Sequence, residues 1–157
     1  MRFIFGLVVA IVANAALAQG KTYLGTVGEL AGKTITPNVV SEFCSERDPS
    51  RAAEYQNLYA SWRNRHAELF AAIDEQLDHA NALLLRQSAP GGDHPIRAAI
   101  DALGAAIRKQ FLSFTPDQAE SLCDGYFPLL ETKDAEFVTE VTALLTEARR
   151  MDTALSH

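Results

Sequence analysis

The stretch that decides the fold class is residues 49–87, PSRAAEYQNLYASWRNRHAELFAAIDEQLDHANALLLRQ. Aromatic and apolar side chains recur along it every three or four residues, the spacing of one buried face of an α-helix. The positions on that face are Tyr55, Tyr59, Trp62, His66, Leu69, Ile73, Leu77, Ala80 and Leu84. Asp48-Pro49 is typical of a helix start, and Ala89-Pro90-Gly91-Gly92 is typical of an end. The pattern predicts one long helix over about residues 49–87.

Similar signals predict helices on both sides of this stretch. Thr36-Pro37 is a cap followed by a proline, which predicts a short helix to about Glu46. Apolar stripes predict further helices over about residues 94–113 and 134–155. Thr115-Pro116-Asp117-Gln118 matches the capping box and predicts another start. Gly125 and Pro128 predict a break or kink in that helix near residues 125–128.

The expected architecture is all-α, because no segment combines strict alternation with β-branched residues. Short connections favour antiparallel neighbours, so we expect a four-helix up-and-down bundle with a short extra N-terminal helix. This bundle domain covers residues 36–157. The glycine-rich segment 19–35 is too apolar for a free tail, and we expect it to lie partly docked on the bundle.

Residues 1–18 are typical of a secretory signal peptide that is cleaved on export. Arg2 is followed by an apolar run from Phe3 to Ala13, and Ala16-Leu17-Ala18 matches a signal-peptidase site. The run is shorter than the roughly 20 apolar residues of a membrane-spanning helix. We therefore expect a periplasmic or secreted protein with no membrane attachment after cleavage.

Two cysteines, Cys44 and Cys123, are present in the chain. In an oxidising compartment the simplest expectation is one intramolecular disulfide. Closing a loop of about 80 residues stabilises a fold by about 4 kcal/mol in the chain-entropy model. Neither cysteine belongs to a redox, zinc or haem-attachment motif.

The charge of the chain bears on its partners. It has 14 Lys and Arg against 20 Asp and Glu, a formal net charge of −6. Nucleic acids and anionic membranes are bound through Lys and Arg, so this balance disfavours both as partners.

His66 is the histidine with the strongest claim to chemistry, because it falls on the apolar stripe one turn from Trp62 and Phe70. One interpretation makes it a haem or metal ligand inside the bundle, with Met151 as a second axial ligand. The ordinary interpretation is a buried or boundary histidine bonded to a neighbour, which we favour because metal sites need clustered ligands. We expect no metal site and no cofactor.

Two further polar groups have ordinary explanations. Glu75 and His79 are an i, i+4 pair, but no second copy exists to complete a di-metal site, and a solvated face is expected. Gly91-Gly92-Asp93-His94 joins two predicted helices. It offers amide groups to an anion, yet Asp93 competes for them, so we interpret it as a turn and a cap.

The densest polar and aromatic patch is Trp62-Arg63-Asn64-Arg65-His66. Trp62, Arg63, Arg65 and His66 are a possible binding surface, since Trp and Arg anchor many interfaces. The ordinary interpretation is an exposed helix face whose arginine stems cover neighbouring rings. We expect no catalytic residues, because the chain has no nucleophile elbow, zinc-protease motif or phosphate loop.

Phe43-Cys44, Asp48-Pro49, Tyr55 and Trp62-Arg63 together resemble a pattern near the N-terminus of small uncharacterised secreted helical proteins of Gram-negative bacteria. The resemblance covers about 25 residues, and it implies a compartment and a helical fold but no activity. We expect a non-enzymatic exported protein that binds another protein in the periplasm, as an inhibitor, immunity factor or assembly factor. The alternative is a small-molecule or haem carrier that uses the bundle interior near His66.

Overall fold

A computed structural model describes residues 22–87 and 95–155, and all regular structure within these ranges is helical. The helices are α2 (Tyr23–Arg47), α3 (Ala52–Arg65), α4 (Ala67–Gln87), α5 (Pro95–Leu112), α6 (Pro116–Thr132) and α7 (Asp134–Leu155). The expectation of an all-α fold is confirmed for the described residues. The predicted leader, residues 1–18, and the turn at residues 91–94 lie outside them.

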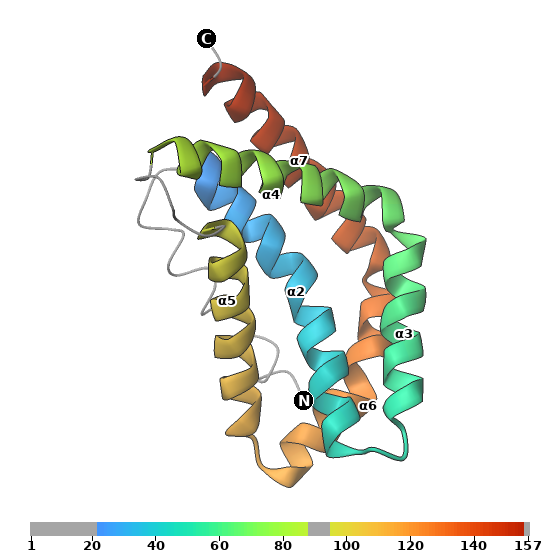
Figure 1. Ribbon diagram of the computed structural model, residues 1–157. Helices are drawn as coiled ribbons and strands as arrows, with labels where there is room; N and C mark the ends of the chain where they lie inside the picture. Colours follow the sequence, from blue (N-terminus) through green and yellow to red (C-terminus); the bar gives the residue numbers. More distant parts are fainter. Residues whose placement is uncertain (1–21, 88–94, 156–157) are drawn as a thin grey trace.

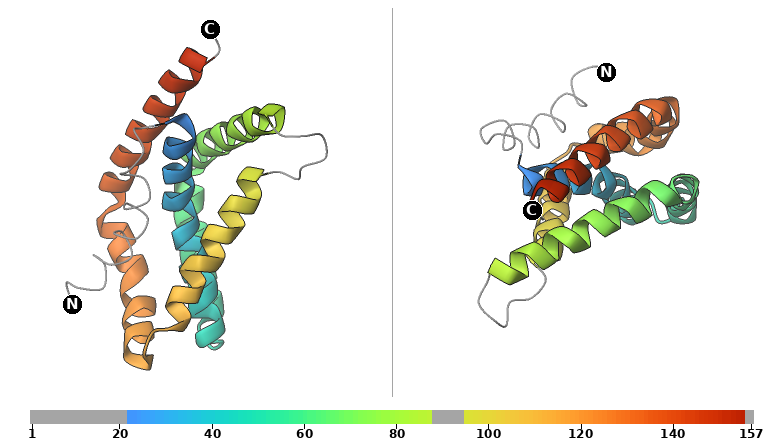
Figure 2. Two further views of the ribbon diagram at one scale, coloured as in Figure 1. Left: turned by 90° about the vertical axis from the view of Figure 1, so that its left-hand side faces the viewer. Right: turned by 90° about the horizontal axis from the view of Figure 1, so that it is seen from above.

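Helix α2 lies at the centre of the molecule and contacts each of the other five helices. In Figure 1, α3 and α5 run along its two sides, while α4 crosses near its N-terminal end. Figure 2 places α4 and α7 on opposite sides of the N-terminal half of α2. This arrangement around one central helix does not confirm the expected four-helix up-and-down bundle.

The prediction that a short helix begins at Thr36-Pro37 was wrong. α2 begins at Tyr23 instead, where the Thr22 side chain accepts a hydrogen bond from the Gly25 amide at 3.1 Å. Pro37 is buried inside the helix. The hydroxyls of Thr34 and Thr36 donate to the carbonyls of Ala31 and Gly32, both at 3.0 Å, in the turn before the proline. The helix stays continuous through the proline because this part of α2 is buried against the surrounding helices.

The predicted single helix over residues 49–87 is two helices, α3 and α4, that change direction at His66. The amide of His66 closes the last turn of α3 on the Trp62 and Arg63 carbonyls, and its own carbonyl accepts from Phe70 in α4. The interruption lasts one residue, so the apolar spacing continues across it. Periodicity therefore could not reveal the change of direction.

The later helices agree with the sequence except at one point. The Thr115 and Gln118 side chains make both hydrogen bonds of the predicted capping box. Of the break or kink predicted near residues 125–128, the break does not occur, because α6 continues through Pro128 to Thr132. Pro128 is exposed, so its ring points away from packed neighbours, and the chain turns at Lys133 instead.

The buried side chains form two clusters, one toward each end of α2. The first holds Tyr23, Val27 and Leu30 against Trp62, Phe70 and Ile73 and the inner face of α7. The second surrounds Cys44 with Phe43, Tyr55, Ile107, Phe111 and Phe127. Tyr59 and Leu130 pack against both clusters. No described helix has the length and apolar composition needed to cross a membrane.

Candidate functional site

Two members of the predicted binding surface are buried. Trp62 is 1% exposed and His66 is 7% exposed. The Trp62 ring packs against those of Phe70 and Phe137, with centroids 5.4 and 4.8 Å away. His66 Nε2 lies 2.7 Å from Asp134 Oδ1, at the start of α7. His66 is thus a buried histidine bonded to a neighbour.

The two arginines of the same patch face different surroundings. Arg65 makes two hydrogen bonds to the carboxylate of Glu131, at 2.7 and 2.8 Å. Arg63 lies over the Phe70 ring, with 5.3 Å from its guanidinium carbon to the ring centroid. The four residues therefore do not form one exposed surface, and the sequence-based patch is corrected to a buried pair and two separate arginines.

Glu75 and His79, the i, i+4 pair singled out in the sequence, also contact other residues of the chain. His79 Nδ1 lies 2.9 Å from Asp152 Oδ2 in α7, and Glu75 lies 3.9 Å from Arg149. Among the described residues, no cluster of three His, Cys, Asp or Glu side chains could hold a metal ion. These contacts tie α4 to α7.

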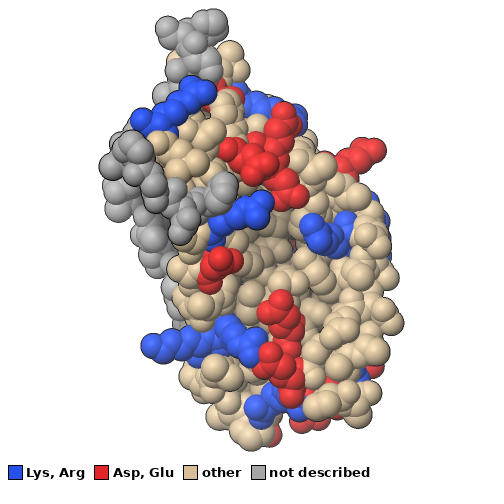
Figure 3. Space-filling model, in the orientation of Figure 1, with Lys and Arg blue, Asp and Glu red and all other residues tan. Residues whose placement is uncertain are grey.

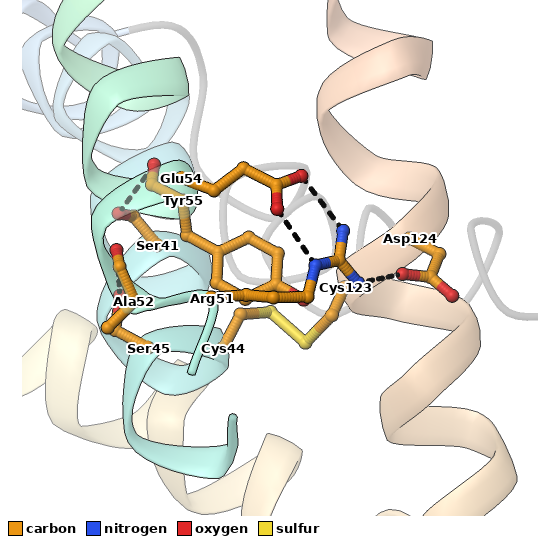
Figure 4. Close-up of a disulfide and its surroundings, with 9 residues drawn as sticks. All are labelled: Ser41, Cys44, Ser45, Arg51, Ala52, Glu54, Tyr55, Cys123 and Asp124. Carbon is orange, nitrogen blue, oxygen red and sulfur yellow. Dashed lines mark hydrogen bonds and ion pairs between the residues drawn. A yellow bond between two sulfur atoms is a disulfide. The ribbon is translucent and has the colours of Figure 1, made fainter. Parts of the chain in front are cut away.

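The predicted disulfide between Cys44 and Cys123 is present. It joins α2 to α6, with 5.6 Å between the two Cα atoms and a sequence separation of 79. Figure 4 shows Arg51 beside it, between the carboxylates of Glu54 and Asp124. Arg51 bonds Glu54 at 2.9 Å and Asp124 at 2.7 Å. Its guanidinium also lies over the Tyr55 ring, 4.9 Å from the centroid.

A small hollow of about 190 Å³ lies beside this disulfide. The charges along it are largely used within the protein. The Arg51 guanidinium lowers the pKa of the Glu54 carboxyl, and the Ser50 hydroxyl, which donates to Asp48, lowers the pKa of that carboxyl. A hollow of this size, whose central cation Arg51 is already paired with Asp124, has little to offer a ligand.

The larger concave site is a cleft of about 630 Å³ between α2, α3, α4 and α5, which we call the four-helix cleft. It lies on the face shown in Figure 3, where charged side chains of both signs surround a tan, uncharged centre. Its lining residues are Ala31, Thr34, Ile35, Asn38, Tyr59, Arg63, Phe70, Asp74, Leu77, Asp78, Asn81, Ile96, Arg97, Ile100 and Asp101. The volume falls within the range of about 300–1,000 Å³ common for ligand sites.

The buried and partly buried side chains that line the four-helix cleft form its floor, and most of them are apolar, with Thr34, Asn38 and buried Asn81 as the polar members. Phe70 is buried, and Ile35, Leu77, Ile96 and Ile100 are partly buried. α5 approaches α2 closely here because residue 104 is glycine. A Cβ atom at Gly104 would lie 3.0 Å from Cδ1 of Ile35.

The charged side chains at the rim are Arg63, Asp74, Asp78, Arg97 and Asp101, and all five are exposed. None of them makes an ion pair with another residue of the described ranges. Burial raises the pKa of the Tyr59 hydroxyl. The positive charge of Arg63 lowers this pKa, and the negative charge of Asp74 raises it. The five charged side chains of the rim are therefore available to a binding partner.

Sequence reasoning missed this cleft. Asp74 and Asp78 are one turn apart, which places them on one face of α4, but such pairs are usual on exposed helices. The cleft needs the change of direction at His66 and the inward position of α2, and no local pattern predicts either. Comparison of the chain with protein-family models, with curated proteins and with solved structures finds no match.

Proposed function

We propose that the protein is an exported, non-enzymatic helical protein that binds another macromolecule in the periplasm through the four-helix cleft. The observation that carries the proposal is an apolar floor surrounded by five exposed charges without ion-pair partners in the described ranges. Binding sites combine apolar area with a few polar groups that fix orientation. The Cys44–Cys123 disulfide is compatible with an oxidising compartment.

The openness of the site favours a segment of a macromolecule over a small molecule. Carriers bury most of a small ligand's surface inside a closed pocket. Here the charged lining residues of α3, α4 and α5 are all exposed, so the rim stays in contact with solvent. A protruding segment of a partner can lie along such a cleft with its other face exposed.

The haem or small-molecule carrier centred on His66 loses its support. The imidazole is bonded to Asp134 and packs against the rings of Trp62 and Phe137, each 5.4 Å away. An axial ligand needs an imidazole nitrogen that faces an open cavity, whereas His66 is 7% exposed and lies among aromatic rings. The concave site lies beside this cluster, and His66 is not among its lining residues.

Site-specific photocrosslinking in intact cells tests the proposal. A benzophenone amino acid replaces Ile100, which lines the cleft, and in a control chain replaces Leu112, which is 67% exposed on the same helix. We expect a discrete crosslinked adduct from position 100 and none from position 112. The absence of adducts from position 100, or the same adducts from both positions, would contradict binding in the cleft.

A further inference from the structure

The charges of the four-helix cleft allow its occupant to be specified further, on the basis of the proposed function. We infer that the cleft binds an amphipathic protein segment that carries Lys or Arg beside its apolar side chains. Some charged side chains of the rim already contact other residues of the chain and others do not, and this difference indicates the charge of the partner.

The acidic side chains of the rim are less involved in contacts within the chain than the basic ones. Asp74 and Asp78 project from one face of α4, and Asp101 projects from α5. Some carboxylates elsewhere are held by cations of the chain itself, as Glu131 is by Arg65 and Glu54 is by Arg51, whereas others, such as Glu68, are exposed without an ion pair in the described ranges but lie outside the cleft. Within the described ranges, these three aspartates have no such partner.

The rim has two basic side chains, Arg63 and Arg97, and each has a neighbour in the chain that reduces its availability to a partner. Arg63 is stacked on the Phe70 ring, an arrangement that stabilises a cation and orients it along the cleft wall. Arg97 lies one turn from Asp101 on α5, so each side chain partly offsets the charge of the other. Three carboxylates therefore face two cations, and a partner cation meets a net negative rim without displacing an existing ion pair.

The floor sets the second requirement. Ile35, Phe70, Leu77 and Ile100 come from three helices and present apolar surface at the bottom of the cleft. A helix laid in an apolar groove contacts it through side chains at i, i+3, i+4 and i+7. A segment with that stripe and flanking Lys or Arg satisfies both the floor and the acidic rim.

The test uses two synthetic peptides with leucines at the same i, i+3, i+4 and i+7 positions, one with lysines between them and one with glutamates. Fluorescence anisotropy measures the binding of each labelled peptide to the oxidised full chain. We expect the lysine peptide to bind about tenfold or more tightly than the glutamate peptide, and its affinity to fall with added salt.

Variants separate the cleft from the general acidity of the chain. Asp74→Asn with Asp78→Asn should weaken the lysine peptide by about three- to tenfold, as expected for two exposed ion pairs. Glu68→Gln with Glu75→Gln removes the same charge from α4 outside the cleft and should leave the affinity within about twofold. Circular dichroism of both variants confirms that each is folded.

Equal binding of the two peptides, tighter binding of the glutamate peptide, or equal effects of the two double variants would overturn the inference. So would the absence of binding by the lysine peptide. The crosslink from position 100 does not depend on the sign of the partner's charge. If it forms while the peptide results fail, the proposed function stands and the basic character of the partner is wrong.

Discussion

The hollow beside the disulfide and the four-helix cleft differ in what their charged side chains contact. At the disulfide, Arg51 bonds both Glu54 and Asp124 and covers the Tyr55 ring. At the cleft, exposed Asp74, Asp78 and Asp101 have no ion-pair partner among the described residues. The difference indicates that Arg51 reinforces the disulfide region by contacts within the chain, whereas under the proposed function the three aspartates of the cleft serve recognition.

The two sites lie at different places along α2. The disulfide joins α2 to α6 inside the second cluster, where Cys44 is fully buried. The cleft lies along the middle of α2, beside both clusters: Phe70 belongs to the first, and Ile35 packs against the second. A central helix that contacts all the others can hold the fold at one end while presenting a concave face along its side.

The largest effect is expected at the disulfide. Replacing Cys44 and Cys123 together by alanine should lower the free energy of unfolding by about 4 kcal/mol, because the bridge closes a loop with a sequence separation of 79. Urea denaturation of the oxidised wild type and the double variant measures the loss. A loss under about 1 kcal/mol would show that the disulfide end does not carry the stability assigned to it.

A smaller loss is expected where α3 turns into α4. Asp134→Ala removes the hydrogen-bond partner of buried His66, which should cost about 1–3 kcal/mol of unfolding free energy. Asp117→Ala is the matched control, because it removes an exposed carboxylate from the first turn of α6 and leaves no buried group unpaired. Equal losses in the two variants would mean that the His66–Asp134 contact adds nothing beyond the charge at a helix start.

Two glycine substitutions compare the cleft floor with an open helix face. Gly28→Ala should stabilise α2 by about 0.5–1 kcal/mol, since a Cβ there meets no atom within 4 Å. Gly104→Ala gains the same helix propensity but presses on Ile35 at 3.0 Å, so its net change should be lower by about 1 kcal/mol.

Thermal unfolding of both glycine variants, with anisotropy of the lysine peptide, checks this prediction. Because Ile35 lines the cleft, Gly104→Ala should also weaken peptide binding, whereas Gly28→Ala should not. A gain in stability by Gly104→Ala as large as that of Gly28→Ala, with unchanged binding, would argue against the close approach of α5 to α2.

The smallest effect concerns the tyrosines and is absent near neutral pH. Burial raises the pKa of all four tyrosines, Tyr23, Tyr55, Tyr59 and Tyr126, above 10.0, and that of Tyr23 to about 12. Folding favours the neutral form of these tyrosines, so their contribution to the free energy of unfolding is fully present below pH 10. This contribution is lost as pH rises toward 12.

Absorbance titration of the native protein should show no tyrosine that ionises with a midpoint at 10.0. Tyr23→Phe should reduce the loss of stability above pH 10, because the Tyr23 hydroxyl, which donates to the Gln76 carbonyl at 3.2 Å, no longer ionises. A tyrosine with an ordinary pKa would contradict the packing of one of the two clusters.

The sequence predicted the helices whose starts carry unambiguous signals. The capping box at Thr115, the last helix from residue 134 and the pairing of the two cysteines all appear as expected. In each of these cases the signal depends on residues close in sequence or, for the cysteines, on the absence of alternatives. The packing of the rest of the chain does not alter them.

The sequence failed where tertiary contacts override a local signal. Pro37 has the pattern of a helix start but lies buried within α2, and Pro128 lies exposed within α6. The turn at His66 keeps the apolar spacing intact while its side chain contacts Asp134, distant in sequence. The four-helix cleft combines side chains from four helices, so it could not be found before the course of the chain was known.

The most direct test of the distinction between the disulfide region and the four-helix cleft is an NMR titration of the oxidised, isotope-labelled full chain with the lysine peptide. The account predicts that amide shifts change in the parts of α2, α3, α4 and α5 that line the cleft, and that the amides around Cys44 and Cys123 do not move. Shifts centred on the disulfide, or spread evenly over all the helices, would contradict it.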